Sequence, residues 1–422
     1  MLHVTLMLAN ASLVYGERYE KIYHQIVAYK LFVMTTHSLP KHIAFSQSLA
    51  SYTKYNLSDS TAQALTLNQL CILADSKVDK SNTQHANLGD TLLQYSPLQG
   101  DLVLRQEIIN FHQALNSHTS KIGVDNAITF CGAQEALSAI YQSLLSAEDE
   151  IVVMTPSYPS LVNMAKSMGV IVREIPLCAD NNWQVNIDDF KRTVNDKTKL
   201  IVMNSPHNPT GSVIATELAE EILQLAQQYQ CYLLSDDVSQ ASNYYGLALA
   251  HRYLDYQKSI VVGVMSKSLG LAGIRIGWAV TPNNKLRDQL LAIKAVNSIC
   301  CSKIDEKLAV LALQNRSEIL ANNNQTILDN ISLFKAFIDR HSDKLGWQPP
   351  KAGMLSLVEV KNISSITSWA AQVTQESGVL LLPSELFGMT GNYFRLGLGQ
   401  KSFAHTLLVF ERQLLSMDNG IV

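Results

Sequence analysis

Lys267 is the residue of this sequence whose surroundings best suit a nucleophilic amine. It follows a β-rich run, SIVVGV (259–264), lies between Ser266 and Ser268, and precedes Arg275 by eight residues. A nearby cation lowers the pKa of a lysine, and the neutral amine can then attack a carbonyl carbon. The pattern therefore predicts covalent chemistry at this lysine, although most lysines at strand ends are simply solvated.

A carboxylate and an amide follow two other β-rich runs. Asp236 comes after CYLLS (231–235), where a buried carboxylate needs a cationic partner such as a metal ion or a protonated ring nitrogen. No His, Cys or Asp at ligand spacing completes a metal site, so we expect no metal. Asn208 follows LIVMN (200–204) in the turn SPHNPTG, where it offers an amide donor, although Asn-Pro and Thr-Gly are also ordinary turn sequences.

Two further features follow β-rich runs. A small-residue turn leads from AITF (127–130) into an apolar helical pattern, where free backbone N–H groups can bind a phosphate. The residues of this turn are Gly132, Ala133 and Gln134. Tyr158 follows IVVM (151–154), and its ring either stacks on a planar cofactor or packs within the loop. Each signal is weak alone, because glycine turns and loop tyrosines are common.

The elements that must position these residues alternate along the chain. Amphipathic helical patterns such as QEALSAIYQSLLS (134–146) lie between some of the β-rich runs, and several of these runs are apolar at nearly every position. The runs are AITF (127–130), IVVM (151–154), VIVREI (170–175), LIVMN (200–204), CYLLS (231–235), SIVVGV (259–264) and GWAV (277–280). This order predicts an α/β fold with a mostly parallel sheet, whose ligands bind at the carboxyl ends of the strands. A long helical pattern followed by LSLVEV and YFRLGLG predicts a second, smaller α+β domain.

The length and composition limit the possible classes. The length of 422 residues, with a mass of 46.7 kDa, predicts two or three domains. The hydrophobic fraction of 47% is enough for a large core. Only 16% are charged and the net charge is −3, so we expect no nucleic-acid partner. Six cysteines without a Cys-x-x-Cys pair, and no apolar run of membrane-spanning length, predict a cytoplasmic protein without a membrane partner. The apolar start, MLHVTLMLANASLVYG, lacks the basic region of a signal peptide and predicts a helix or arm.

Taken together, these sequence features match the needs of one cofactor. A phosphate-binding turn, a stacking ring, a carboxylate for a ring nitrogen and a nucleophilic amine are what pyridoxal 5′-phosphate needs. At these residues the chain resembles the class I/II aminotransferases, which are pyridoxal-phosphate enzymes of fold type I. The matching motifs are YSPLQGDLVLR (95–105), GAQEAL, PSYPS, HNPTG, SDD, SKSLGLAGIRIGW and FRLGLG (394–399). They occur in the family's order and spacing over about 300 residues.

The resemblance implies the fold and its division. We expect a mostly parallel central sheet with helices on both faces, and a smaller α+β domain. Residues 1–85 would form an N-terminal arm and part of the small domain, 86–298 the large cofactor-binding domain, and 299–422 the C-terminal small domain. The first 85 residues have no clear match to the family's substrate-gating segment.

The resemblance also implies roles for the catalytic and substrate-binding residues. Lys267 would form a Schiff base with the cofactor and later move the Cα proton of the substrate. Asp236 would keep the pyridine nitrogen protonated, and Asn208 would donate to the ring oxygen O3′. Arg395, in FRLGLG, would bind the α-carboxylate of an amino acid substrate, next to Asn208.

The remaining implied contacts hold the cofactor. Ser266 and Arg275 would bind its phosphate together with the backbone of Gly132, Ala133 and Gln134. Tyr158 would stack on the ring. Tyr95 would reach the phosphate bound by a neighbouring subunit, which implies a homodimer with shared active sites.

One position departs from the family pattern. Ser239 stands where the family usually has a tyrosine that also bonds O3′, and serine is too short to replace it directly. The segment GVLLLPSELFG (378–388) is similar to the capreomycidine synthase-like members, which lack that tyrosine and cyclise hydroxylated arginine. Two activities therefore stay open, an aminotransferase acting on an L-α-amino acid and a lyase that eliminates and cyclises. For the lyase, Asp237 or Glu385 would bind the guanidinium.

A third interpretation belongs to another functional class. Some regulators carry an aminotransferase-like sensor domain behind a basic DNA-binding segment. The acidic balance and the lack of a helix-turn-helix pattern near the N-terminus argue against a regulator here.

Overall fold

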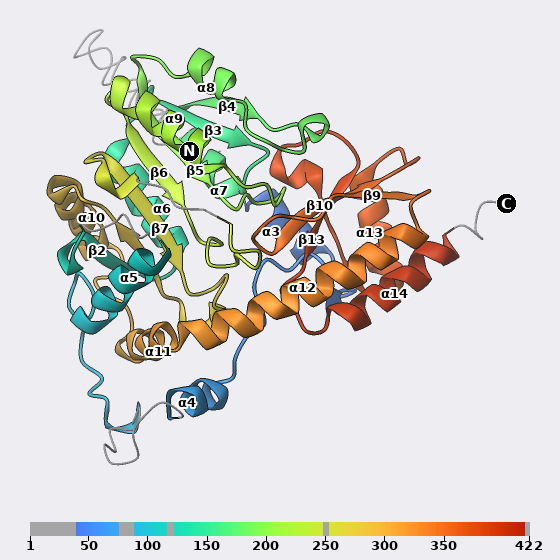
Figure 1. Ribbon diagram of the computed structural model, residues 1–422, viewed down its shortest axis with the longest axis horizontal. Coiled ribbons are helices and arrows are strands. Elements are labelled where there is room, and N and C mark those ends of the chain that lie inside the picture. Colours follow the sequence, from blue (N-terminus) through green and yellow to red (C-terminus); the bar gives the residue numbers. More distant parts are fainter. Residues whose placement is uncertain (1–38, 76–87, 116–121, 248–252, 418–422) are drawn as a thin grey trace, which may run out of the picture. The chain divides into compact units, whose positions relative to one another are not determined.

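The computed structural model describes residues 39–75, 88–115, 122–247 and 253–417 (Figure 1). The chain divides into two compact units, Met1–Ala44 and Phe45–Val422. Helix α3, Lys41–Ser48, begins at the end of the first unit. The predicted N-terminal helix or arm over residues 1–16 lies outside the described residues. The predicted domain boundaries at 85 and 298 both fall inside the second unit, and they stay predictions.

The second unit contains a seven-stranded sheet whose order is β2-β8-β7-β6-β5-β3-β4. Every predicted β-rich run forms one of its strands. Their bounds are β2 Ala127–Phe130, β3 Glu150–Thr155, β4 Ile171–Pro176, β5 Thr198–Asn204, β6 Tyr232–Asp236, β7 Ser259–Val264 and β8 Gly277–Val280. The neighbouring pairs from β4 to β7 are parallel, and β8 pairs antiparallel with both β2 and β7.

Helices cover both faces of this sheet because alternate residues of the inner strands are apolar on each side. On one face Val202 packs in a cluster with helix α6, Ala133–Leu144, and on the other Ile201 packs with helix α9, Thr216–Gln228. The other helices of this part are α5 Leu102–Leu115, α7 Pro159–Ser167, α8 Ile187–Thr193, α10 Asn284–Val296 and α11 Lys303–Gln314. The predicted mostly parallel α/β fold is therefore confirmed.

A smaller antiparallel sheet follows in the sequence, in the order β12-β13-β10-β9. Its strands are β9 Leu345–Trp347, β10 Leu355–Val360, β12 Leu382–Pro383 and β13 Tyr393–Gly397. One apolar cluster joins this sheet to the helices α12 Arg316–Arg340, α13 Ile366–Ser377 and α14 Phe403–Ser416. This part confirms the expected smaller α+β arrangement.

An early segment of the chain joins these C-terminal elements. Strand β1, Tyr55–Asn56, pairs parallel with β11, Val379–Leu380, and helix α4, Leu67–Asp75, follows it. The same segment therefore enters the neighbourhood of β13, which carries Arg395.

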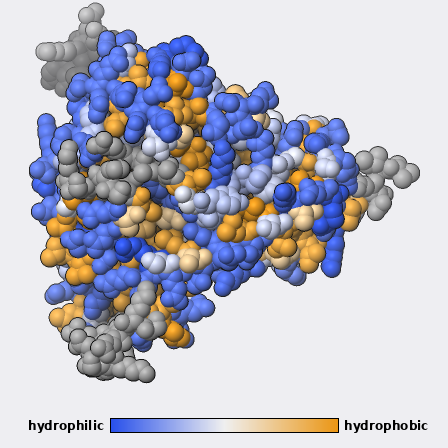
Figure 2. Space-filling model, in the orientation of Figure 1, coloured by the Kyte–Doolittle hydropathy of each residue, from blue (hydrophilic) through white to orange (hydrophobic). Residues whose placement is uncertain are grey.

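The surface is mostly polar, with apolar residues between the hydrophilic ones on the face that Figure 2 shows. No helix in the described part of the chain is both long and apolar enough to cross a membrane. The cytoplasmic location stays a prediction.

Candidate active site

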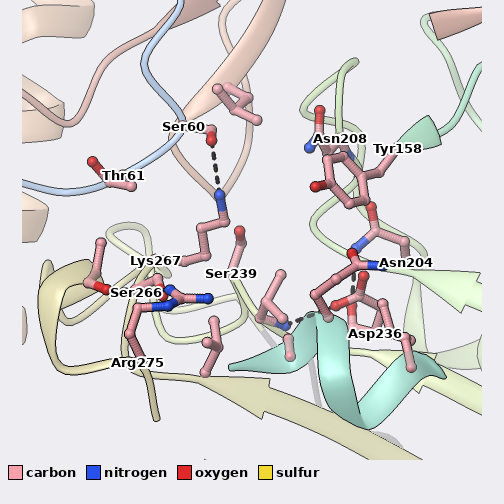
Figure 3. Close-up of a pocket in the computed structure, with 17 residues that line it drawn as sticks. Ser60, Thr61, Tyr158, Asn204, Asn208, Asp236, Ser239, Ser266, Lys267 and Arg275 are labelled. Atoms are coloured by element: carbon pink, nitrogen blue, oxygen red, sulfur yellow. Dashed lines mark hydrogen bonds between the residues drawn. The ribbon is translucent and has the colours of Figure 1, made fainter. Parts of the chain in front are cut away.

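Loops at the carboxyl ends of β3, β5, β6 and β7 surround a cavity of about 270 Å³ (Figure 3). Parallel strands bring these loops to one edge of the sheet, as the sequence predicted. The lining residues are Ser60, Thr61, Ala133, Gln134, Leu137, Tyr158, Asn204, Asn208, Asp236, Val238, Ser239, Val264, Ser266, Lys267, Ala272, Arg275 and Leu355. In Figure 3, Tyr158, Asn204, Asn208 and Asp236 lie on one side, and Ser60, Thr61, Ser266, Lys267 and Arg275 on the other.

Lys267 lies in the loop after β7, and its Nζ is 2.7 Å from the hydroxyl oxygen of Ser60. Burial, together with the positive charges of Arg395 and Arg275, lowers the pKa of this lysine to about 8, against the opposing effect of the Asp59 and Asp236 charges. The sequence predicted a lowered pKa from neighbouring cations, whereas burial is the larger cause. A larger share of neutral amine at physiological pH suits a nucleophile.

Asp236 ends β6, and its side chain is almost completely buried. Its carboxylate accepts one long hydrogen bond, 3.4 Å from the backbone nitrogen of Val238. Burial raises the pKa of this carboxyl to about 6, against the opposing effect of the Lys267 charge. A buried carboxylate held so weakly is stabilised by a cation beside it, such as a protonated ring nitrogen.

Asn204, at the end of β5, is a site residue that the sequence reasoning missed. Its side-chain amide donates to the backbone oxygen of Asp236 at 2.9 Å, and its side-chain oxygen accepts from the backbone nitrogen of Asn208 at 2.8 Å. It therefore links the backbones of Asp236 and Asn208. Its position as the polar last residue of an apolar strand was the available signal.

The start of α6 and the side chain of Arg275 form a cradle that suits an anion. Gly132 precedes the helix with φ of 91°, and a Cβ built on it would lie 2.6 Å from Nη2 of Arg275. The guanidinium therefore lies against the helix N-terminus, where unpaired N–H groups and the helix dipole already favour an anion. Ala133, Gln134 and Ser266 line the same cavity.

This close approach makes Gly132→Ala a test of the cradle. The added methyl group meets Arg275, and the positive φ strains any residue other than glycine by about 1–3 kcal/mol. We expect the affinity for pyridoxal 5′-phosphate to fall about 10- to 100-fold, measured by titrating the apoprotein. Gly123→Ala is the matched control, because a Cβ there meets nothing within 4 Å. Equal affinities of the two variants would show that the Gly132 turn is not the phosphate cradle.

Arg395 lies in β13 and is buried, which lowers its pKa to about 10. Nη2 donates to the backbone oxygen of Ser58 at 2.8 Å, and Nη1 donates to the side-chain oxygen of Asn208 at 3.3 Å. Nε has no hydrogen-bond partner among the described residues, and the guanidinium lies 5.1 Å from the ring centre of Phe387. Arg395 does not itself line the cavity but contacts Asn208, which does. A buried cation with an unused donor suits a carboxylate ligand.

The other predicted residues divide between this cavity and other places. Tyr158, at the start of α7, and Ser239 line the cavity. Tyr95 does not, and its side chain is 81% exposed. Ser60 and Thr61 are lining residues that the sequence reasoning missed, because nothing in a loop with so many hydroxyl residues distinguished them.

The two acidic residues expected to bind a guanidinium are not brought to this cavity. Asp237 follows Asp236 but lines a separate, much smaller cavity beside Trp278, and accepts a hydrogen bond from the hydroxyl of Ser235. Glu385 accepts a hydrogen bond from the hydroxyl of Thr367 on α13. Successive residues of a strand end point to opposite faces, so only the first of the two aspartates can face the cavity.

These residues fit pyridoxal 5′-phosphate. The cavity offers an amine of lowered pKa, a buried carboxylate in want of a cation, and a cationic cradle at a helix N-terminus. An aldehyde, a pyridine nitrogen and a phosphate match these three groups. Together with the mostly parallel sheet they define a pyridoxal-phosphate enzyme of fold type I.

The comparisons with known proteins identify the family. The model of the aminotransferase class I and II family matches residues 60–403, and the chain belongs to this family. Its cofactor is accordingly pyridoxal 5′-phosphate, which confirms the prediction.

Individual relatives are distant. The chain is 28% identical to a capreomycidine synthase of Streptomyces vinaceus over 62% of its own length and 67% of the relative's. It is 24% identical to an arginine–pyruvate transaminase of Pseudomonas aeruginosa over 72% and 77% of the two chains. The crystal structure of a PLP-dependent aminotransferase from Streptococcus suis superposes with a TM-score of 0.80 at 24% identity, covering 90% of this chain and 97% of the other. The structure of the PLP-dependent cyclase OrfR gives 0.78 at 19% identity, covering 90% and 97%.

Proposed function

We propose that the protein is an aminotransferase that acts on an L-α-amino acid. The observation that carries the proposal is the convergence of Lys267, Asp236 and Arg275 on one cavity, with Arg395 hydrogen-bonded to a residue of its wall. This set provides an amine, a carboxylate and two cations with separate places. One cation suits the phosphate of the cofactor and the other the carboxylate of a substrate.

The proposed roles follow from the position of each group. When bound, pyridoxal 5′-phosphate supplies an aldehyde that captures amines and a ring that accepts electrons as the Cα–H bond breaks. Asp236 would hold a proton at the ring nitrogen, and its burial would strengthen that interaction. The α6 N-terminus and Arg275 would hold the phosphate, and Tyr158 would lie against the ring. Lys267 would supply the amine that holds the aldehyde, and its Nζ, when free, would move the Cα proton of the substrate.

Substrate binding rests on Arg395 and Asn208. Nε of the arginine is buried and has no hydrogen-bond partner in the described part of the chain, so the guanidinium keeps an unused donor for a substrate carboxylate. The bond between Nη1 and Asn208 orients the guanidinium toward the cavity wall. Recognition of the α-carboxylate is common to all amino acids and leaves the side chain of the substrate open.

An elimination and cyclisation reaction on a hydroxylated arginine is the alternative. Ser239 lines the cavity where the family usually has a tyrosine, and this leaves more room beside the ring. The similarity to a capreomycidine synthase is consistent with this alternative.

One experiment separates the two reactions. The loaded enzyme is incubated with single amino acids, including arginine and hydroxylated arginine, together with 2-oxoglutarate or pyruvate. Appearance of an oxo acid from the amino acid, with a new amino acid from the acceptor, supports transfer. Loss of water with the amino group retained supports cyclisation instead and overturns the aminotransferase proposal.

We further propose that the protein works as a homodimer. Large apolar side chains are exposed close together in the sequence around Tyr95, among them Leu92 at 74% and Leu93 at 81%. Exposed apolar patches of this kind mark interfaces. We expect light scattering to give twice the 46.7 kDa of one chain, and Leu93→Glu to shift the mass toward one chain. Leu408→Glu, on α14, is the control, and a single-chain mass for the unaltered protein contradicts the proposal.

A further inference from the structure

Ser60 is the described residue whose side chain bonds the Lys267 amine. Its hydroxyl oxygen lies 2.7 Å from Nζ, and Figure 3 shows the lysine side chain extending toward it and away from Asp236. No other hydrogen bond to Nζ is found among the described residues. The partner therefore comes from a segment 207 residues away in the sequence, on the opposite side of the cavity from the carboxylate.

The segment that carries Ser60 is held firmly on both sides. The backbone nitrogen of Ala62 donates to the backbone oxygen of Lys267 at 3.2 Å. On the other side, the backbone oxygen of Ser58 accepts from Arg395, and the amide of Gln400 donates to the backbone oxygen of Thr61 at 2.9 Å. The hydroxyl thus has a fixed place between the lysine loop and the strand of the arginine.

Two glycines of the FRLGLG motif make this packing possible. A Cβ at Gly397 would lie 1.9 Å from the backbone oxygen of Asp59, and one at Gly399 would lie 2.3 Å from that of Thr61. Neither distance leaves room for a side chain. Only glycine at positions 397 and 399 therefore lets the backbone next to Ser60 pack this closely. The motif therefore also sets the position of this hydroxyl.

We propose that Ser60 is a positioning residue for Lys267. The Ser60 hydroxyl holds the lysine amine in place whenever the lysine is not bonded to the cofactor. This inference rests on the proposed function, in which the released amine moves the Cα proton. A buried amine without a partner samples several rotamers, and proton transfer demands one geometry. The hydroxyl supplies that geometry without a competing charge, whereas a carboxylate there would hold the amine protonated.

The test compares Ser60→Ala with Ser60→Thr, which keeps the hydroxyl. Proton removal should slow about 10- to 100-fold in the alanine variant. The isotope effect with an α-deuterated amino acid should therefore rise, and Ser60→Thr should restore much of the unaltered behaviour. Ser60→Cys, of similar size but with a weaker donor, replaces the alanine variant if the latter does not fold. Ser332→Ala, which removes an exposed hydroxyl on α12, should change nothing.

A second readout does not depend on turnover. In the apoprotein, pH-dependent labelling of Lys267 should follow an apparent pKa near 8, with reactivity rising as pH rises through it. Loss of the hydroxyl, which accepts from the charged amine, destabilises that charged form and should shift the curve to lower pH. An isotope effect and a titration curve that both match the unaltered protein would overturn the proposal. Failure of the proposed function looks different, because the unaltered protein would then neither bind cofactor nor exchange amino groups.

Discussion

Lys267→Ala should abolish the visible absorbance that the protein acquires with pyridoxal 5′-phosphate, and reduce amino acid turnover by at least about 1,000-fold. The variant removes both the amine that bonds to the cofactor and the base that moves the Cα proton. The cradle of Gly132 and Arg275 is untouched, so the cofactor should still bind, although more weakly. Absorbance spectra and steady-state rates with an accepted amino acid measure the two effects.

Lys258→Ala is the matched control for this prediction. Lys258 directly precedes β7, whereas Lys267 follows it, so the two lysines lie near opposite ends of the same strand. Lys258 is only half-buried, and its Nζ donates to the backbone oxygen of Gln230. The control should keep the full absorbance and rate. A Lys267→Ala protein that keeps both would show that another amine does the chemistry.

Asp236→Asn should lose activity about 100- to 10,000-fold while gaining stability in the apoprotein. The amide has the shape of the carboxylate but cannot hold a proton on a ring nitrogen by charge. The activity loss should therefore persist even when the cofactor saturates the protein. Rates at saturating cofactor measure this part of the prediction.

The stability gain follows from the sign of the pKa shift. Burial raises the pKa of Asp236 from 3.8 to about 6, so the unfolded chain ionises more easily than the folded one. The apoprotein is therefore destabilised as pH rises from about 4 to 6, and it stays so above that range. Removing the charge should raise the free energy of unfolding at pH 7.5 by about 1–3 kcal/mol, with little change at pH 4. Asp180→Asn, outside the cavity, is the control. An Asp236→Asn protein as active and as stable as the unaltered protein would contradict the role assigned to Asp236.

The strands and the loop positions of the site were predictable because they depend on local patterns. Strands buried on both faces are apolar throughout, and polar residues directly after them mark the edge where ligands bind. Asp236, Asn208 and Lys267 were found in this way. It was harder to predict which of the two successive aspartates faces the cavity, because this depends on the alternation of side chains at the end of β6.

The contacts between distant segments were not predictable. Ser60 bonds Lys267 across 207 residues, and Arg395 bonds the backbone of Ser58 across 337. No periodicity in either segment encodes its partner, because such contacts depend on how the whole chain packs. The cause of the lowered pKa of Lys267 was misjudged for the same reason, since burial in a folded cavity cannot be read from neighbouring residues.

Whether this cavity is the active site is tested most directly by locating the covalent link between cofactor and protein. The loaded protein is treated with sodium borohydride, which makes the link permanent, and is then digested and analysed by mass spectrometry. We expect a pyridoxyl group on the peptide that carries Lys267, and no such group in the Lys267→Ala protein. A pyridoxyl group on another lysine, such as the buried Lys294, or on none, would contradict the central claim that this cavity is the active site.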